Sequence, residues 1–381
     1  MTTKLSVQSS TLDLDGALPK PPVINEDPER PRTLFPKITD KERHFLREYG
    51  HKVRSSEGPT TQYLDRVIPL IGTVKLHGAH CDLVLTSSDE LIVQSRNRVG
   101  LSEDLDAYDM AKTLLPLKTQ ILRLRDRYHE RYKTLNPGVD IDEGFPTIIA
   151  GEWVGPGVQK TVAINALPRK CFVILSVSLN DAWLPDITYG DIHHEEIGIY
   201  HVSRGGYFFD ELHLADIKAS KDRLQIPTRE VERECPFAKS FGLHGIGEGI
   251  VWKAEHPLGS DARFWIKTKG PLHRVTDTQK LGLDEKRMGG KKKALEFAKA
   301  AVTEGRMEQG WEYLIEMGKP RDRTSTGEFL KWVVNDVLVE EKGGIEELEV
   351  DEGLLKSAIR NVCKEWFARK LEEVGLVRGG S

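Results

Sequence analysis

The sequence lacks the features typical of a secreted, a membrane-bound or a zinc-ribbon protein. Its cysteines are few and far apart, with no CxxC pair: Cys81, Cys171, Cys235 and Cys363. Such spacing argues against a zinc ribbon and favours a reducing compartment. The longest apolar run, 171–179, is far too short to span a bilayer. The first residues, MTTKLSVQSS, lack the layout of a secretory signal. We therefore expect a cytoplasmic or nuclear protein without a membrane partner.

The chain also lacks the positive net charge common among nucleic-acid-binding proteins. Its 55 lysines and arginines are outnumbered by 59 aspartates and glutamates, giving a formal net charge of −4. Net charge is a weak test, however, because a positive groove can lie on an acidic body. The local basic run at 286–293 matters more. It could be a solvated linker, a nuclear import signal or a nucleic-acid contact, and we favour the last.

Composition and patterning divide the chain into two folded domains and an arm. Residues 1–35 are rich in Ser, Thr, Pro and acidic residues without apolar periodicity, which predicts a disordered arm. We expect an α+β domain at 36–285, a basic glycine hinge at 286–290 and an all-helical domain at 291–381. A length of 381 residues is sufficient for one large and one smaller core.

The predicted large domain is built on antiparallel sheet. Residues 81–86 and 90–95 flank a Ser-Ser-Asp turn and predict a hairpin. A long charged helix is expected at 103–134, ending near Asn136-Pro137-Gly138. Four β-like runs lie beyond the hairpin, and three amphipathic helical stripes occupy the tail. The runs are 147–150, 171–179, 249–254 and 263–268.

The segment Lys75-Leu76-His77-Gly78 is the strongest candidate for chemistry. It ends an apolar stretch and directly precedes the predicted hairpin. A lysine that attacks phosphorus must be neutral, so it needs nearby positive charge or a metal to lower its pKa. The glycine would let the backbone approach a nucleotide closely. The plain alternative is a lysine at a strand end followed by a turn.

Three further segments carry charged side chains suited to a nucleotide. Glu152 stands in a run that leads into a Gly-rich turn, where its carboxylate could accept hydrogen bonds from a ribose. Glu248 opens a β-like run and could hold Mg²⁺ against a phosphate. Lys267 and Lys269 would share one strand face, where an anion between them would relieve their repulsion. Taken singly, each also fits a surface turn or a solvated edge strand.

Together these segments resemble motifs I, III, IV and V of the covalent nucleotidyltransferases, which comprise ATP-dependent ligases and mRNA-capping enzymes. The closest resemblance is to the RNA ligase 2 group of phage and kinetoplastid RNA editing. It rests on the strings KLHG, GEWVGPGVQK, EGIVWK and IKTK, in that order. It spans roughly residues 70–275 and continues more loosely through the tail, because this group ends in a small all-α domain.

The resemblance implies a three-step reaction with ATP and Mg²⁺ or Mn²⁺. Lys75 would form lysyl-AMP, AMP would pass to a 5′-phosphate, and a 3′-hydroxyl would then displace AMP. By similarity, His77 and the paired lysines Lys267 and Lys269 would contact phosphate, and Glu248 would support the metal. Gly78, Glu152 and Arg96 would line the nucleotide site, with Arg98 as the alternative to Arg96.

The sequence departs from the family pattern at two places. After KLHG it has Ala79-His80 where the phage ligases tend to have Thr-Asn. The position of the adenine-stacking aromatic falls on Ile174, so either this aliphatic residue covers the adenine or Phe172 does.

The expected partner is RNA with 5′-phosphate and 3′-hydroxyl ends, in a nicked duplex or a broken loop, possibly with DNA-containing strands. Two alternatives remain open: a DNA ligase or mRNA guanylyltransferase with the same lysine chemistry, and a catalytically silent RNA-binding relative. The histidine of KLHG and the helical tail argue against the former. The intact charged residues argue against the latter.

Overall fold

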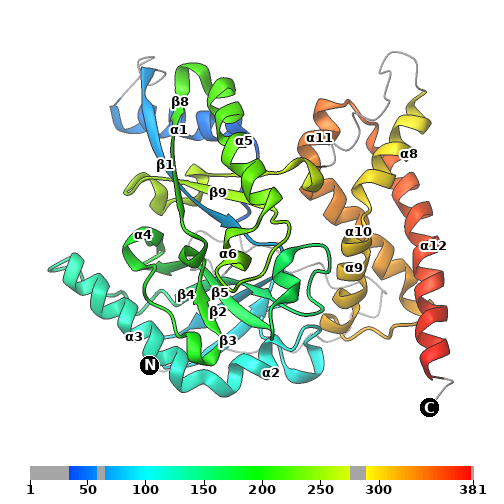
Figure 1. The fold of residues 1–381 in the computed structure, drawn as a ribbon, viewed down its shortest axis with the longest axis horizontal. Coiled ribbons are helices and arrows are strands. Elements are labelled where there is room, and N and C mark those ends of the chain that lie inside the picture. Colours follow the sequence, from blue (N-terminus) through cyan, green and yellow to red (C-terminus); the bar gives the residue numbers. More distant parts are fainter. Residues whose placement is uncertain (1–33, 58–64, 275–288, 379–381) are drawn as a thin grey trace.

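The computed structural model describes residues 34–57, 65–274 and 289–378. Two antiparallel sheets and their covering helices form the larger part of the molecule, and a group of helices stands along one flank (Figure 1). This is the expected α+β architecture with a C-terminal all-α region. Among the described residues, no helix is both long enough and apolar enough to cross a membrane.

The first sheet has the strand order β10-β9-β1-β8. Its members are β1 (Val67–Lys75), β8 (Tyr207–His213), β9 (Gly249–Ala254) and β10 (Trp265–Lys269). All three pairings are antiparallel, and Gly249 lies opposite both Lys75 and Lys269. The residue before Gly249 therefore emerges between two lysines.

The second sheet has the order β3-β2-β4-β5-β6, with β7 paired to β5. Its strands are β2 (Ala79–Leu85), β3 (Leu91–Ser95), β4 (Thr147–Val154), β5 (Cys171–Leu179), β6 (Ala182–Trp183) and β7 (Ile199–His201). The predicted hairpin is confirmed as β2 and β3. Only residues 76–78 separate β1 from β2, so the KLHG segment carries the chain from one sheet to the other.

The long helix predicted at 103–134 is shorter than expected. A 3-10 turn at Glu103–Leu105 and α2 (Met110–Leu114) precede α3 (Lys118–Leu135). Pro116 lies between α2 and α3, and proline cannot supply the backbone N–H that a helix interior needs. The predicted end is confirmed, since the helix stops at Leu135. Its buried residues Ile121, Leu124 and Tyr128 pack on the second sheet.

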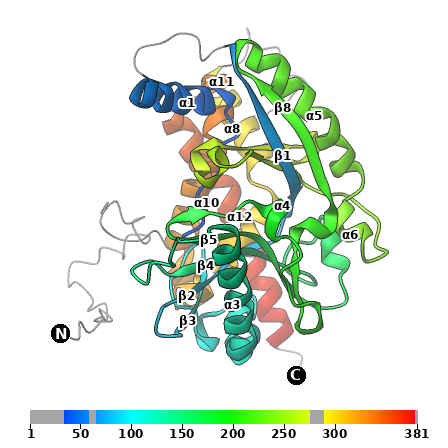
Figure 2. The same ribbon diagram turned by 90° about the vertical axis from the view of Figure 1, so that its left-hand side faces the viewer.

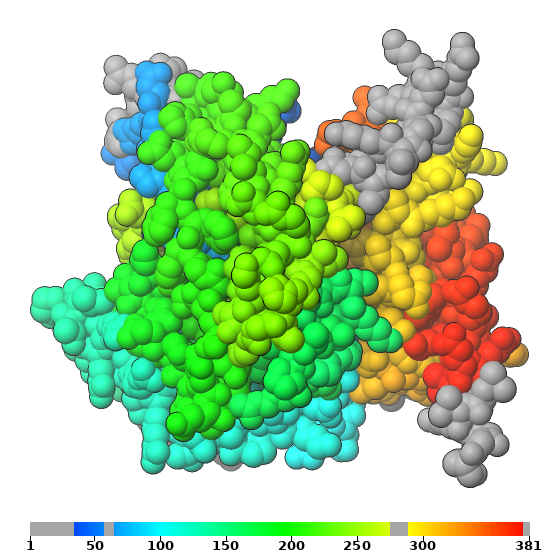
Figure 3. All heavy atoms as spheres, viewed as in Figure 1, coloured from blue at the N-terminus to red at the C-terminus, as the bar shows by residue number. Residues whose placement is uncertain are grey.

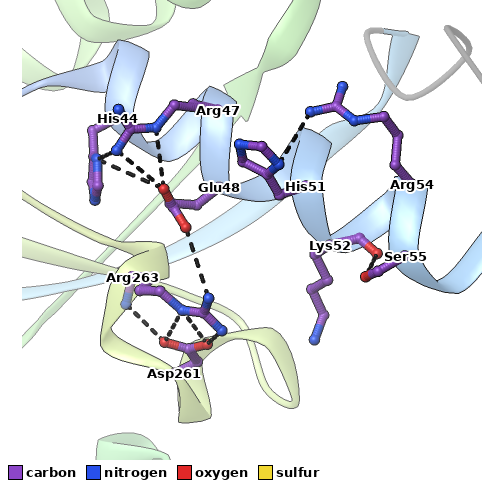
Figure 4. A network of polar contacts seen from close by, with 9 residues as sticks. All are labelled: His44, Arg47, Glu48, His51, Lys52, Arg54, Ser55, Asp261 and Arg263. Carbon is purple, nitrogen blue, oxygen red and sulfur yellow. Dashed lines mark hydrogen bonds and ion pairs between the residues drawn. The ribbon is translucent and has the colours of Figure 1, made fainter. Parts of the chain in front are cut away.

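Helices also cover the first sheet. They are α1 (Glu42–Glu57) and α5 (Ile217–Arg233), with the short α4 (Asp186–Tyr189) and α6 (Pro236–Lys239) nearby. Phe45 of α1 and Leu224 of α5 are fully buried in the core that joins the two sheets. Figure 4 shows a polar connection as well: Glu48 of α1 lies 3.7 Å from the Arg263 guanidinium, which is also paired with Asp261.

The C-terminal helices have a core of their own. They are α8 (Gly290–Ala301), α9 (Glu304–Glu316), α10 (Thr326–Glu340), α11 (Lys342–Glu347) and α12 (Glu352–Arg378). Phe297, Trp311, Phe329 and Phe367 meet in this core, which contains no residue from the sheets. Figure 3 shows these helices gathered on one side of the molecule, in contact with its body, and in the view of Figure 2 they lie behind it. The three predicted amphipathic stripes are the faces that pack here.

Two of the predicted domain boundaries, the end of the arm and the hinge, can be compared with the structure only in part. Phe35, inside the predicted disordered arm, is buried against Ile148, Ala150 and Trp265. Residues 34–35 therefore belong to the folded body, because an aromatic ring gains by leaving water. Residues 1–33 of the arm and 286–288 of the predicted hinge lie outside the described residues. Gly290, at the end of that hinge, is the first residue of α8.

Candidate active site

Lys75, Glu248 and Lys269 form the centre of a charged cluster on the first sheet. The Glu248 carboxylate lies 2.5 Å from the Lys75 amine and 3.1 Å from the Lys269 amine. His77 Nδ1 is 3.5 Å from the same carboxylate. The strand register produces this meeting, since Gly249 is paired with both lysines and brings Glu248 between them. Three predicted site residues thus meet at the carboxylate of a fourth, Glu248.

Burial makes these charges interact strongly. The Glu248 side chain is only 2% exposed, whereas Lys75 keeps 21% of its surface. Burial alone would raise the pKa of Glu248, but the charges of Lys75, Lys269 and His77 outweigh it and hold that pKa well below its usual value. Burial lowers the pKa of Lys75, and Lys269 and Lys267 lower it further against the pull of Glu248. The environment therefore favours the neutral, nucleophilic amine more than water does.

Glu152 reaches the same region from the second sheet. Its Oε1 accepts a 2.8 Å hydrogen bond from the backbone N–H of Gly78. A side chain at position 78 would collide with the Trp153 carbonyl oxygen and lie 2.8 Å from Val154 Cγ1, so the close passage requires glycine. Burial raises the pKa of Glu152. The glycine and the glutamate thus hold the link between β1 and β2 against β4, close to Lys75 in the chain.

Lys267 lies on the same strand as Lys269 but has a different partner. Its amine is 3.2 Å from Glu340 Oε2, at the end of α10, and Lys37 is 2.9 Å from Glu340 Oε1. A carboxylate from the C-terminal helices therefore reaches the predicted phosphate-binding strand.

The two candidate arginines have separate surroundings. Arg96 is exposed, and its guanidinium donates a 2.7 Å hydrogen bond to the Phe35 carbonyl. Arg98 instead donates to the Glu316 carbonyl of α9 at 3.1 Å. Arg98 thus joins the helical region to the body, whereas Arg96 joins the body to the segment before α1. The choice of Arg96 over Arg98 stays a prediction.

Phe172 and Ile174 are not brought to this cluster. Both are 0% exposed in the core between the second sheet and α3. Alternate strand residues face opposite ways, and Cys171 and Val173 of β5 instead pack in the core shared with the first sheet. Val173 is opposite Glu152 in the register. The face of β5 chosen from the sequence is therefore the one turned away from Lys75, and in this structure neither residue is placed to cover an adenine.

Two residues not selected from the sequence also lie at the cluster. The His273 ring is 5.7 Å from that of His77, and Lys37 shares Glu340 with Lys267. His273 stands four residues beyond Lys269, so its proximity to the paired lysines was a usable signal. No sequence signal marked Lys37, because it directly follows the segment predicted to be a disordered arm.

The family follows from a match that runs through this cluster. The model of the family described as RNA ligase matches residues 68–269, more than half of the chain. The chain belongs to the RNA ligase family. The matched range contains Lys75, Glu152, Glu248, Lys267 and Lys269 and ends with the last of them.

Solved structures similar to this family member include an RNA ligase of Naegleria gruberi. Its structure with PPi has 15% sequence identity and a TM-score of 0.38, over 66% of this chain and 60% of that one. A mutant of it with AMP and Mn has 14% identity and a TM-score of 0.37, over 66% and 62%. The chain thus spans less than two thirds of these proteins. No curated protein sequence matches it.

Proposed function

We propose that this protein is an ATP-dependent RNA ligase that works through a lysyl-AMP intermediate on Lys75. The observation that carries the proposal is the placement of Lys75. Its side chain is partly exposed, and its amine has a lowered pKa and pairs with Glu248, which also contacts Lys269 and His77. A nucleophilic amine beside fixed cations suits attack on a phosphate, since those cations stabilise the charge that develops.

The first step forms one bond and breaks one. The Lys75 nitrogen, after losing a proton, would bond to the α-phosphorus of ATP, and the bond from that phosphorus to the bridging oxygen would break. Pyrophosphate leaves with the electron pair. Lys267 and Lys269 stand on one strand face, where they would neutralise phosphate oxygens during this in-line transfer. Glu152 would accept hydrogen bonds from the ribose.

Glu248 fits a divalent metal only in a limited way. Among the described residues there is no group of three or more His, Cys, Asp or Glu side chains that could enclose an ion. One carboxylate together with phosphate oxygens and water is, however, the usual environment of Mg²⁺. Glu248 would therefore be the protein's ligand for Mg²⁺ or Mn²⁺, and the ion, when bound, would neutralise phosphate charge.

The direct test is the intact mass of the protein after incubation with ATP and Mg²⁺. We expect a gain of one AMP that disappears when pyrophosphate is added, because the step is reversible. Incubation with GTP serves as the control, since a guanylyltransferase would gain GMP instead. A protein that gains no nucleotide under any of these conditions would contradict the proposal and favour a silent RNA-binding relative.

We further propose that the strands joined carry a 5′-phosphate and a 3′-hydroxyl. AMP on Lys75 would pass to the 5′-phosphate, and attack by the 3′-hydroxyl would then release AMP. Sealing of a nicked duplex would be compared with sealing of a broken loop, using RNA and DNA versions of each strand. Failure on every RNA substrate by a protein that does attach AMP would refute the assignment to RNA.

A further inference from the structure

A carboxylate from the C-terminal helices binds a pair of lysines, one of which, Lys267, lies on the same strand as Lys269 of the candidate active site. Glu340, the last residue of α10, places Oε1 2.9 Å from the Lys37 amine and Oε2 3.2 Å from the Lys267 amine. The three residues come from the segment before α1, from β10 and from the helical region. Each oxygen of one carboxylate thus has its own lysine.

This arrangement is that of an anion-binding site in which the Glu340 carboxylate is the bound anion. The Lys267 side chain is only 11% exposed. Two lysines held this close repel each other unless a negative group lies between them. Burial alone would raise the pKa of Glu340, but Lys267 and Lys37 outweigh it and keep the carboxylate ionised. A phosphate offers the same kind of charged oxygen acceptor to the same amines.

We propose that Lys37 and Lys267 form a phosphate-binding site that Glu340 fills until a phosphate displaces it. This inference rests on the proposed function, because it assigns the site to the outer phosphates of the nucleotide, the part that leaves as pyrophosphate. Lys267 is two residues from Lys269, which pairs with Glu248 beside Lys75. A triphosphate whose α-phosphorus faces Lys75 could therefore extend toward Lys37.

Occupation of the site is coupled to the position of the helical region. On α10, two turns before Glu340, the Trp332 indole N–H donates to Asn97 Oδ1 at 3.2 Å, and Glu316 of α9 accepts from the Ser95 hydroxyl and the Asn97 amide at 2.9 Å each. Glu340 is thus held at the lysines by a docked domain. A phosphate that displaces Glu340 removes one of the contacts that keep this domain in place.

Inorganic pyrophosphate is the probe for the site, because its binding can be measured by calorimetry without any reaction. We expect Lys37→Ala to weaken pyrophosphate binding by about tenfold, as the loss of one charge-assisted hydrogen bond would. Glu340→Gln should strengthen binding, since it removes the competing charge and leaves both lysines. The matched controls are the exposed residues Lys218 and Glu347, as Lys218→Ala and Glu347→Gln. Thermal melting of each variant checks that it is folded.

Two assays of catalysis separate the sources of the phosphate. If the site serves the nucleotide, Lys37→Ala raises the KM for ATP in AMP attachment and leaves the sealing of a pre-adenylated strand unchanged. If it serves the RNA phosphate, the reverse holds, which would overturn the assignment to pyrophosphate. Folded Lys37→Ala and Glu340→Gln proteins that bind pyrophosphate like the wild type would refute the site. Wild-type protein that binds pyrophosphate yet never gains AMP would refute the proposed function alone.

Discussion

The Lys75 amine, at the end of β1, and the carboxylate of Glu248, directly before the neighbouring antiparallel strand β9, lie 2.5 Å apart, although the two residues are 173 positions apart in the chain. This is a short, charge-assisted hydrogen bond, in which Glu248 holds the lysine. A paired ammonium cannot attack phosphorus. Under the proposed function the ion pair must open before AMP is attached, and burial together with the cations around Lys75 assists the loss of its proton.

Lys75→Ala is expected to abolish AMP attachment without unfolding the protein. The lysine supplies the covalent bond itself, and Glu248 keeps Lys269 and His77 as partners when Lys75 is removed. Intact mass after incubation with ATP measures the loss. The same variant should still seal a strand that arrives already adenylated, because that step needs no nucleophile from the protein. A Lys75→Ala protein that gains AMP would place the nucleophile elsewhere.

Glu248→Ala should lower AMP attachment by about a hundredfold or more, the usual loss when a group that organises charge in the transition state is removed. Glu248→Asp, or a higher concentration of Mg²⁺, should recover part of the activity if the carboxylate holds a metal. Glu255→Ala is the matched control, since Glu255 is exposed just beyond the same strand. Equal activity of Glu248→Ala and Glu255→Ala would show that Glu248 is only structural.

His201 should make the stability of the protein depend on pH. The ring is buried, and its Nδ1 accepts a 3.1 Å hydrogen bond from the Ser203 N–H, which requires the neutral form. Burial, with a smaller effect from Lys253, lowers the pKa of His201 from 6.5 to about 3. Between these two values the unfolded chain binds more protons than the folded one, so the free energy of unfolding decreases as the pH falls.

The contribution of His201 can be isolated with a His201→Gln variant. This variant should be less stable than the wild type at neutral pH, because it loses the buried ring. The difference in Tm should shrink toward pH 5.5, where protonation costs the wild type about 1 kcal/mol. Other groups titrate equally in both proteins. A difference that stays constant from neutral pH to pH 5.5 would mean that His201 is not kept neutral by the fold.

Local sequence patterns predicted much of the fold and part of the candidate site correctly. Alternating apolar residues around a polar turn predicted the β2–β3 hairpin, and strand periodicity placed Lys267 and Lys269 on one face. Both rest on interactions between residues near in sequence. The meeting of Lys75 with Glu248 was implied only through the resemblance, because the register that joins β1 to β9 is a long-range property.

The errors have the same origin. The start of α3 was missed because Pro116 and the turns around it outweighed a continuous charged pattern. Ile174 follows from its position in the family pattern and Phe172 from being the aromatic two residues before it, but the pleat of β5 turns both toward α3. The role of Glu340 has no signal in the sequence, because acidic residues are common at helix ends. Only the tertiary fold brings this one to Lys267.

Cutting the chain after about residue 285 should separate the chemistry with ATP from the joining of strands. Among the residues that the structure describes, the core of the C-terminal helices contains none from the body and the body's cores contain none from these helices, so the truncated protein should stay folded. The contacts it loses at Ser95, Asn97 and Arg98 are polar and would face water without a large cost.

The truncated protein should gain AMP at least as readily as the full chain, because the charged cluster around Lys75 remains and Glu340 no longer occupies Lys267. Sealing of phosphorylated strands should decline, since the basic residues Lys291, Lys292 and Lys293 are lost from the start of α8. The truncated protein's affinity for the strand should also depend less steeply on salt than that of the full chain, because the lost lysines no longer release counterions from phosphate. Full-length Glu316→Ala, which loosens docking but keeps every helix, is the control. A truncated protein that is folded by circular dichroism yet cannot gain AMP, or that seals nicks as well as the full chain, would contradict this division between the two parts.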